Sequence, residues 1–302
     1  MSRRIIMIII IIMAITGCAD AADSRNGRWE TLTMESLVLG KEMTSQVYLP
    51  ENYGGGIKYP VLYFLPSNGG SSFTVTNQFG IAETADELIR SNEINPMIIV
   101  AVGIDNSFGI NSGGETKEIR RALTEEASEV RINEGMYEDY IVSEVIPYID
   151  GHYSTDASRN GRYIGGYSMG GFAALHVAFS HPDLFAKVGG HSPSLIEEVA
   201  DTEEANWQNW LYPNQETRSE RDPLILAETN DLDGLSVFLD TGDSDVNVGG
   251  CQKLYETLME KRYRWNSICF REHMALPIAE AIWTDTCSFT EGHVRQNRKQ
   301  SR

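Results

Sequence analysis

A serine between two glycine pairs is the feature of this sequence best suited to chemistry. Gly166, Ser168 and Gly170 form a G-x-S-x-G pattern within GGYSMGG, after a strand-like run and before a helix-like run. A serine on a tight strand-to-helix turn presents its hydroxyl above the edge of a sheet, and the flanking glycines prevent a clash between strand and helix. The pattern therefore predicts a nucleophilic serine that attacks a carbonyl carbon.

Such a nucleophile needs hydrogen-bond donors for the oxyanion that forms during attack. The backbone N–H of Met169 is one candidate, because it begins the predicted helix and a helix N-terminus carries partial positive charge. The second donor is expected in PSNGGS, the stretch after an apolar strand ending at Leu65, where Ser67 or Asn68 would supply the N–H. Without the serine pattern, PSNGGS would be interpreted as an ordinary flexible turn.

The order of the elements around this serine indicates the fold class. Strand-like runs cover residues 31–39, 43–49, 59–65, 97–104, 162–166, 186–191 and 235–240. Helix-like runs cover residues 74–90, 135–150, 169–180 and about 247–261. Early antiparallel strands followed by repeated strand and helix units favour an α/β fold with a mostly parallel central sheet and helices on both faces.

Two neighbouring stretches resemble the esterase family of α/β-hydrolases that includes esterase D (S-formylglutathione hydrolase), feruloyl and siderophore esterases, and mycolyltransferases. They are YEDYIVSEVIPYIDGHY and RYIGGYSMGGFAALHVAFSHPDLF, in which helix, serine turn and HPDLF follow the family's order. The resemblance covers residues 30–261 and implies an α/β-hydrolase domain over residues 29–261, with a triad in the order serine, acid, histidine. Many relatives have His-Gly where this chain has Pro66 and Ser67, which leaves the second oxyanion donor open.

Three acidic residues follow the strand-like run 235–240: Asp240, Asp243 and Asp245. Asp245 has the G-x-x-D spacing from Gly242 that resembles the family's acid, and it is favoured over Asp243. Its role would be to orient the histidine and to stabilise the imidazolium. The alternative interpretation of this cluster is a polar turn.

The general base should be one of six histidines. Four precede the acid in the chain: His152, His176, His181 and His191. Of these, His176 within a helix and His181 in a His-Pro turn are expected to be structural, whereas His191 at a strand end could line the site. Chain order leaves His273 and His293, and His273 lies closest to the place of the family's base.

Residues 262–302 show neither the clean final strand, the glycine-rich histidine loop nor the last amphipathic helix of the family. The pattern changes if the coding DNA from Lys261 onward is read in the frame that starts at the third base of each codon. In that frame, the codons of Trp265 and Asn266 necessarily contain a Glu codon, those of Met274 and Ala275 a Gly codon, and those of Trp283 and Thr284 an Asp codon. Permitted choices elsewhere give a strand, a PGxHG turn and an amphipathic helix. We therefore hypothesise a frameshifted tail, which the coding DNA across codons 255–275 tests.

The N-terminus has the order of a secretory signal. Two arginines precede an apolar run over residues 5–15, and the sequence ITGC ending at Cys18 resembles the bacterial lipobox. The resemblance implies a signal over residues 1–18, a lipidated Cys18, a polar tether over residues 19–28, and a membrane-anchored protein of the bacterial cell envelope. A plain signal peptide or an anchor helix is the alternative.

Composition narrows the partners and cofactors. A formal charge of −18 argues against nucleic acid and anionic lipid headgroups as partners. No H-x-x-x-H or C-x-x-C spacing occurs, so neither a metal nor an organic cofactor is predicted. The spacing of the four cysteines predicts no disulfide framework and no redox role.

The sequence thus predicts a serine hydrolase acting on a small-molecule carboxylic ester through an acyl-enzyme on Ser168. Two alternatives stay open: an acyltransferase on the same scaffold and, if the tail over residues 262–302 is genuine, a catalytically impaired binding lipoprotein. The aromatic-rich excursion over residues 194–233, with Trp207, Trp210 and Tyr212, could form a lid over the site or a surface subdomain that buries its own aromatics.

Overall fold

An eight-stranded sheet organises the chain in the computed structural model, which describes residues 26–113, 131–199, 206–261 and 268–271. The strand order is β1-β2-β4-β3-β5-β6-β7-β8. The strands are β1 (Arg28–Ser36), β2 (Lys41–Leu49), β3 (Val61–Leu65), β4 (Ile98–Ala101), β5 (Arg162–Tyr167), β6 (Lys187–His191), β7 (Ser236–Asp240) and β8 (Ile268–Arg271). The pairs β1–β2 and β2–β4 are antiparallel, and all later pairs are parallel.

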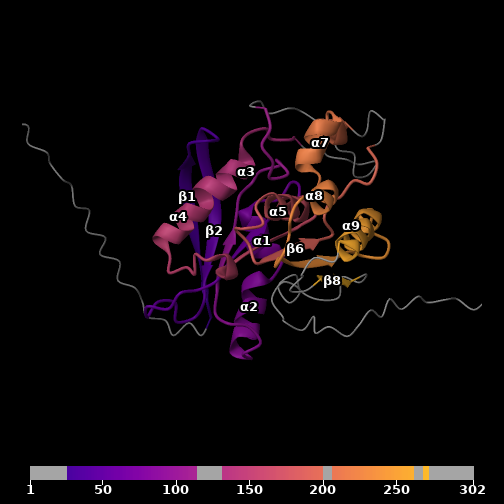
Figure 1. Cartoon of the computed structure of the whole chain (residues 1–302). Helices are drawn as coiled ribbons and strands as arrows, with labels where there is room; N and C mark the ends of the chain where they lie inside the picture. The colour runs from indigo at the N-terminus through magenta and orange to yellow at the C-terminus, as the bar shows by residue number, and fades with distance from the viewer. Residues whose placement is uncertain (1–25, 114–130, 200–205, 262–267, 272–302) are drawn as a thin grey trace, which may run out of the picture.

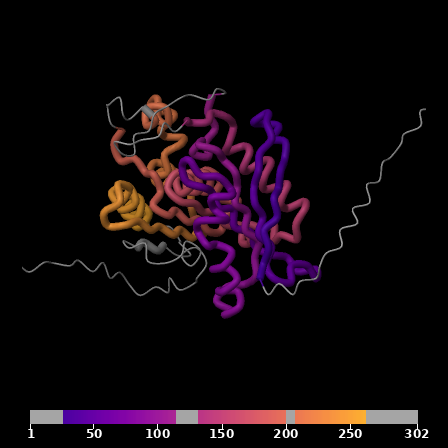
Figure 2. Tube along the Cα trace, turned by 180° about the vertical axis from the view of Figure 1, so that it is seen from behind, coloured from indigo at the N-terminus to yellow at the C-terminus, as the bar shows by residue number. Residues whose placement is uncertain are grey.

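Helices cover both faces of this sheet. They are α1 (Ser72–Gln78), α2 (Ile81–Arg90), α3 (Tyr137–Asp139), η1 (Tyr140–Val145), α4 (Ile146–His152), η2 (Arg159–Gly161), α5 (Met169–Ser180), α6 (Asn206–Leu211), α7 (Gln215–Arg221), α8 (Pro223–Thr229) and α9 (Val248–Glu260). The β1–β2 hairpin and α9 lie on opposite sides of the molecule in both views (Figure 1, Figure 2). The α/β architecture predicted from the element order is confirmed.

Side-chain alternation along the central strands explains why both faces are covered. In β3, Tyr63 and Leu65 belong to the core that includes α5, α8 and α9, whereas Leu62 and Phe64 pack with the apolar side chains of α1 and α2. Successive side chains of a strand point to opposite faces, so a strand that is buried throughout must have a helical layer on each side.

Two predicted boundaries were wrong for local reasons. The helix expected over residues 74–90 is two helices, because Gly80 adopts the left-handed conformation with φ 60° between α1 and α2. The strand expected over residues 31–39 ends at Ser36, where the carboxylate of Glu144 accepts hydrogen bonds from the backbone N–H of Leu37 and of Val38. These bonds to Glu144 hold the turn that connects β1 to β2.

Part of the C-terminal stretch also differs from expectation. Residues 262–302 were expected to lack the family's final strand, but residues 268–271 form β8, which pairs in parallel with β7 through the register Val237–Ile268 to Asp240–Arg271. The run ICFR is short and rich in residues that favour strands, so it can add to the exposed edge of β7. The remainder of this stretch, like Cys18 and the signal, lies outside the described residues.

The excursion after β6 packs its aromatic side chains into the main core. Trp207 is buried and stacks on Phe108 with ring centroids 5.5 Å apart, and Phe108 in turn meets the edge of Phe172 on α5. Trp210 donates from Nε1 to Glu134. Within the described part of the excursion, these rings therefore stabilise the fold around α5. None of the helices in the described residues is long and apolar enough to cross a membrane.

Candidate active site

The chain turns sharply at Ser168, between β5 and α5. Ser168 has φ 55° and ψ −114°, a conformation that costs a serine about 1–3 kcal/mol. The glycines on each side permit the turn: a Cβ at Gly166 would collide with the carbonyl oxygen of Gly170, and a Cβ at Gly170 would collide with that of Leu65. The serine turn predicted from G-x-S-x-G is thus present, and the surrounding fold sustains its strain.

Backbone hydrogen bonds from the next strand hold this turn. The N–H of Ser168 donates to the carbonyl of His191, at 2.8 Å, and the carbonyl of Ser168 accepts from the N–H of Ser194, at 3.1 Å. The same carbonyl accepts from Phe172 in the first turn of α5, at 3.0 Å. The backbone of Ser168 is consequently fixed by the end of β6 as well as by its own helix.

The residues predicted to supply the oxyanion hole lie beside the serine turn. Met169 is buried as the first residue of α5, where backbone N–H groups have no partner within the helix. Ser67 and Asn68 are in the turn after β3, which is closed by a bond from the N–H of Gly70 to the carbonyl of Ser67, at 2.9 Å. Their assignment as donors stays a prediction.

The three acidic residues after β7 have different environments. Asp240 is buried at the end of the strand, and both of its carboxylate oxygens lie 3.1 Å from Nδ1 of His191. Asp243 is exposed. Asp245 is half-buried, and its carboxylate accepts from the hydroxyl of Ser192, at 2.5 Å, and from the N–H of Asn247, at 2.9 Å. Asp245 is therefore the acid that is tied to the loop next to Ser168.

None of the four histidine side chains in the described residues makes a hydrogen bond to Ser168. His152 is exposed and stacks on Tyr148, while His176 and His181 both contact the carboxylate of Glu138. The structural role expected for His176 and His181 is in agreement with these bonds. The predicted base His273 and its alternative His293 lie outside the described residues.

His191 meets Ser168 only through its backbone carbonyl, and its ring packs in the core. The ring is fully buried between Phe64 and Phe238, with centroids 6.3 and 5.5 Å away, and Nδ1 bonds Asp240. Its Nε2 is buried without a hydrogen-bond partner. His191 therefore supports the serine turn through its backbone carbonyl. Its side chain could have lined the site, but it is buried in the core instead.

Sequence reasoning missed the short turn after β6. Ser192 contacts Asp245, Ser194 contacts Ser168, and the side-chain amide of Asn247 donates to the carbonyl of Ser192, at 3.2 Å. The available signal was the polar tripeptide SPS directly after a parallel strand, since ligands in such sheets bind outside the carboxyl ends of the strands.

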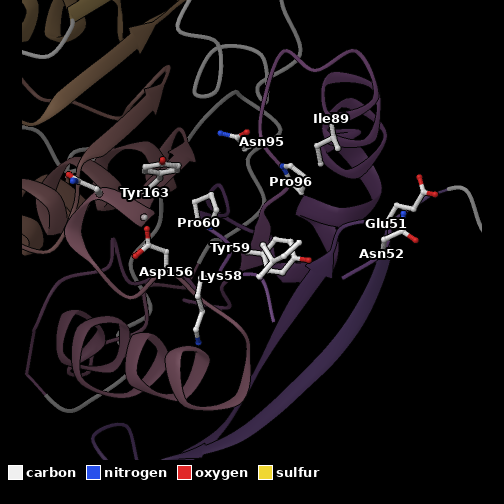
Figure 3. Close-up of a pocket in the computed structure, with 13 residues that line it drawn as sticks. Glu51, Asn52, Lys58, Tyr59, Pro60, Ile89, Asn95, Pro96, Asp156 and Tyr163 are labelled. Carbon is white, nitrogen blue, oxygen red and sulfur yellow. The ribbon is translucent and has the colours of Figure 1, made fainter. Parts of the chain in front are cut away.

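A cavity of about 580 Å³ opens near the amino ends of the parallel strands β3 and β5 (Figure 3). Tyr59 and Pro60 line it just before β3, and Asn160 and Gly161 line it just before β5. These residues precede the amino ends of parallel strands, whereas Ser168 follows a carboxyl end. An ester bound in this cavity would lie at the opposite end of the strands from Ser168.

The described residues contain no group of three His, Cys, Asp or Glu side chains arranged to hold a metal ion. Cys251, in α9, is a free and buried thiol, and burial raises its pKa to about 12. This thiol is therefore protonated at neutral pH and is a poor nucleophile.

A mostly parallel sheet with a strained serine between a central strand and a buried helix defines the α/β-hydrolase class. The chain belongs to the family described as "Putative esterase", whose profile matches residues 36–266, more than half of its length. Its similarity to solved structures supports the same fold. A ferulic acid esterase superposes with a TM-score of 0.66 at 23% identity, over 82% of this chain and 90% of that one.

An S-formylglutathione hydrolase from Agrobacterium tumefaciens superposes with a TM-score of 0.61 at 20% identity, over 85% of this chain and 92% of that one. In sequence, the chain is 31% identical over 189 residues to an endo-1,4-beta-xylanase/feruloyl esterase of Xylanibacter ruminicola, covering 59% of this chain. It spans only 24% of that protein's length. Two of these relatives are named as ferulic acid or feruloyl esterases and one as a hydrolase of S-formylglutathione, which is a thioester, and the xylanase/feruloyl esterase is much longer than this chain.

Proposed function

We propose that this chain hydrolyses small carboxylic esters through an acyl-enzyme on Ser168. The observation that carries the proposal is the strained conformation of Ser168, with φ 55°, at the start of the buried helix α5. A fold maintains such strain mainly at sites where a side chain must be presented for function. Gly166 and Gly170 allow this turn, because there is no space for a Cβ atom at either position.

The reaction follows from the placement of these groups. Oγ of Ser168 bonds to the carbonyl carbon, its proton passes to an imidazole, and the carbonyl electron pair moves onto oxygen, where the N–H of Met169 and an N–H from Ser67 or Asn68 stabilise it. Collapse of this intermediate expels the alcohol, which takes the proton from the imidazolium. Water then attacks the acyl-enzyme by the same steps and releases the acid.

We assign the role of general base to His273 and the role of orienting its imidazole to Asp245. Asp245 has a half-buried carboxylate next to the loop that contacts Ser168, and each of its oxygens keeps a lone pair for a further donor. His273 lies outside the described residues, so its assignment rests on the order serine, acid, histidine along the chain.

The names of the relatives suggest which substrates to compare. Structures superposing on this chain are named ferulic acid esterase and S-formylglutathione hydrolase. We propose that the acyl group is small or aromatic, so methyl ferulate and S-formylglutathione should be assayed beside the general reporter p-nitrophenyl acetate. The ratio of the kcat/KM values for methyl ferulate and S-formylglutathione decides which of these two substrate classes the site prefers.

A fluorophosphonate probe tests the nucleophile, and histidine variants test the base. The wild-type chain should be labelled and should hydrolyse p-nitrophenyl acetate, whereas Ser168→Ala should do neither. His273→Ala should lose at least about a thousandfold in kcat, as for a triad member, while the matched variant His293→Ala should retain activity. Absence of wild-type labelling would contradict the esterase proposal for this chain.

One observation favours a second candidate, a catalytically silent binding protein on the same fold. Within the described residues, no histidine side chain hydrogen-bonds Ser168, whose hydroxyl lies next to that of Ser194, and the carboxylate of Asp245 accepts from the hydroxyl of Ser192. The labelling experiment separates the candidates. The coding DNA across codons 255–275 decides independently whether the histidine loop is encoded in another frame.

We also propose that the protein is exported and anchored by a lipid on Cys18. This proposal rests on the signal-like order of residues 1–18, which the structure does not describe. Incorporation of a labelled fatty acid by the wild type but not by Cys18→Ser in a bacterial host would support it. Equal incorporation by both would refute it.

A further inference from the structure

A second serine hydroxyl meets the nucleophile. Oγ of Ser194 lies 3.2 Å from Oγ of Ser168, within hydrogen-bond distance, and the backbone N–H of Ser194 donates to the carbonyl of Ser168. Ser194 is 1% exposed, so water does not compete for its hydroxyl. Among the residues that the structure describes, Ser168 is the partner of this hydroxyl.

Hydrogen bonds hold the turn that carries Ser194. Ser192 adopts φ 42°, its N–H donates to the carbonyl of Asp240, at 2.8 Å, and its hydroxyl donates to Asp245. Pro193 restricts the backbone between the two serines. A hydroxyl held by packing and by such hydrogen bonds needs little reorganisation to act on its neighbour.

The chemistry of the nucleophile sets the direction of this hydrogen bond. The proton of Ser168 must leave toward the imidazole base, so Ser168 cannot donate that proton to Ser194 during attack. The hydroxyl of Ser194 can instead donate to Oγ of Ser168 and keep its own proton throughout. A donor to an oxygen that gains negative charge forms a stronger bond as the charge develops.

We propose that Ser194 is a catalytic residue that donates a hydrogen bond to Oγ of Ser168, orienting this oxygen and stabilising its charge as the proton leaves. The inference rests on the proposed esterase function and adds a member to its site. Because the bond strengthens only as Ser168 is deprotonated, its loss should lower the rate of attack and leave substrate binding unchanged.

Substitution of Ser194 by alanine removes the hydroxyl with little change in volume. Ser194→Ala should decrease kcat for p-nitrophenyl acetate and the rate constant of fluorophosphonate inactivation by about 10- to 150-fold, the effect expected for one hydrogen bond to an atom that becomes charged. KM and the melting temperature should stay close to the wild-type values. Ser194→Thr, which keeps the hydroxyl, should recover most of the lost rate.

A matched control is Ser219→Ala, which removes an exposed hydroxyl bonded to the carbonyl of Gln215 within α7. This variant should inactivate and hydrolyse at the wild-type rate. If Ser194→Ala reacts as fast as the wild type, or if KM and the melting temperature account for its loss, the inference is overturned and the esterase proposal stands. If the wild type itself is not labelled, the esterase proposal fails first, and the role of Ser194 fails with it.

Discussion

The hydroxyl of Ser192 donates to the carboxylate of Asp245, with 2.5 Å between Oγ and Oδ2. This bond joins the loop after β7 to the turn after β6, whose next serine, Ser194, contacts Ser168. Asp245 and Ser168 are therefore both positioned by the tripeptide Ser192, Pro193 and Ser194. An imidazole entering between them would meet a carboxylate whose orientation is already determined by Ser192 and Asn247.

The environments of the acidic residues predict which one is needed for turnover. Asp245→Asn should lower kcat for p-nitrophenyl acetate by about three to four orders of magnitude, because the amide no longer stabilises the imidazolium. The exposed neighbour Asp243 provides the control, and Asp243→Asn should stay within about threefold of the wild type, as surface substitutions usually do. A larger loss in Asp243→Asn than in Asp245→Asn would reverse the assignment.

Backbone strain at Ser168 predicts a gain in stability from glycine. Both Ser168→Gly and Ser168→Ala should be inactive, but glycine accepts φ 55° without steric cost. After subtraction of the extra entropy of glycine in the unfolded chain, Ser168→Gly should exceed Ser168→Ala by roughly 1 kcal/mol in free energy of unfolding. Denaturant titration measures this difference. Equal stabilities would mean that the turn stores no strain.

The close approach of α5 to the loop after β3 predicts that Gly170 tolerates no side chain. A Cβ there would overlap the carbonyl oxygens of Leu65 and Pro66, so Gly170→Ala should destabilise the protein by about 1–3 kcal/mol. Gly151, on α4, has open space around it, and Gly151→Ala should instead be neutral or stabilising by up to about 1 kcal/mol. Melting curves of both variants test the contrast.

Glu138 in α3 bridges His176 in α5 and His181 directly after α5, and this bridge predicts a pH dependence of stability. Glu138 accepts from Nε2 of His176, at 3.2 Å, and of His181, at 2.8 Å. Burial raises the pKa of Glu138, but the bonds to the two histidines outweigh it and lower this pKa well below the ordinary 4.5. The hydrogen bond to Glu138 raises the pKa of His181 above its ordinary 6.5.

The signs of these shifts define the window. Because the pKa of Glu138 is lowered, its contribution to the free energy of unfolding is complete above about pH 4.5 and is lost as pH falls. Because the pKa of His181 is raised, its contribution is complete below about pH 6.5 and is lost as pH rises. The melting temperature of the wild type should therefore exceed that of Glu138→Gln most between these two values. A constant difference from pH 4 to 8 would show that the bridge contributes no linked stability.

Much of the architecture was predictable because it depends on local patterns. The apolar strand β3, the helix α5 and the glycines around Ser168 are recognised from alternation, helical spacing and turn chemistry within about twenty residues. The break at Gly80 was missed because a single left-handed glycine can either end a helix or be tolerated in it. The strand β8 was missed because four residues give too short a pattern to detect.

The sequence by itself determined the α/β fold class, the strained serine turn and the acidic cluster after β7, since each arises from residues close together in the chain. Only the tertiary structure decided how these parts meet. Ser194 and Ser168 are separated by 26 residues, and Ser192 and Asp245 by 53, so no local pattern predicts their contacts. Parallel pairing of β5, β6 and β7 brings their carboxyl ends to one edge of the sheet, and that edge is where the serines, the acid and the nucleophile assemble.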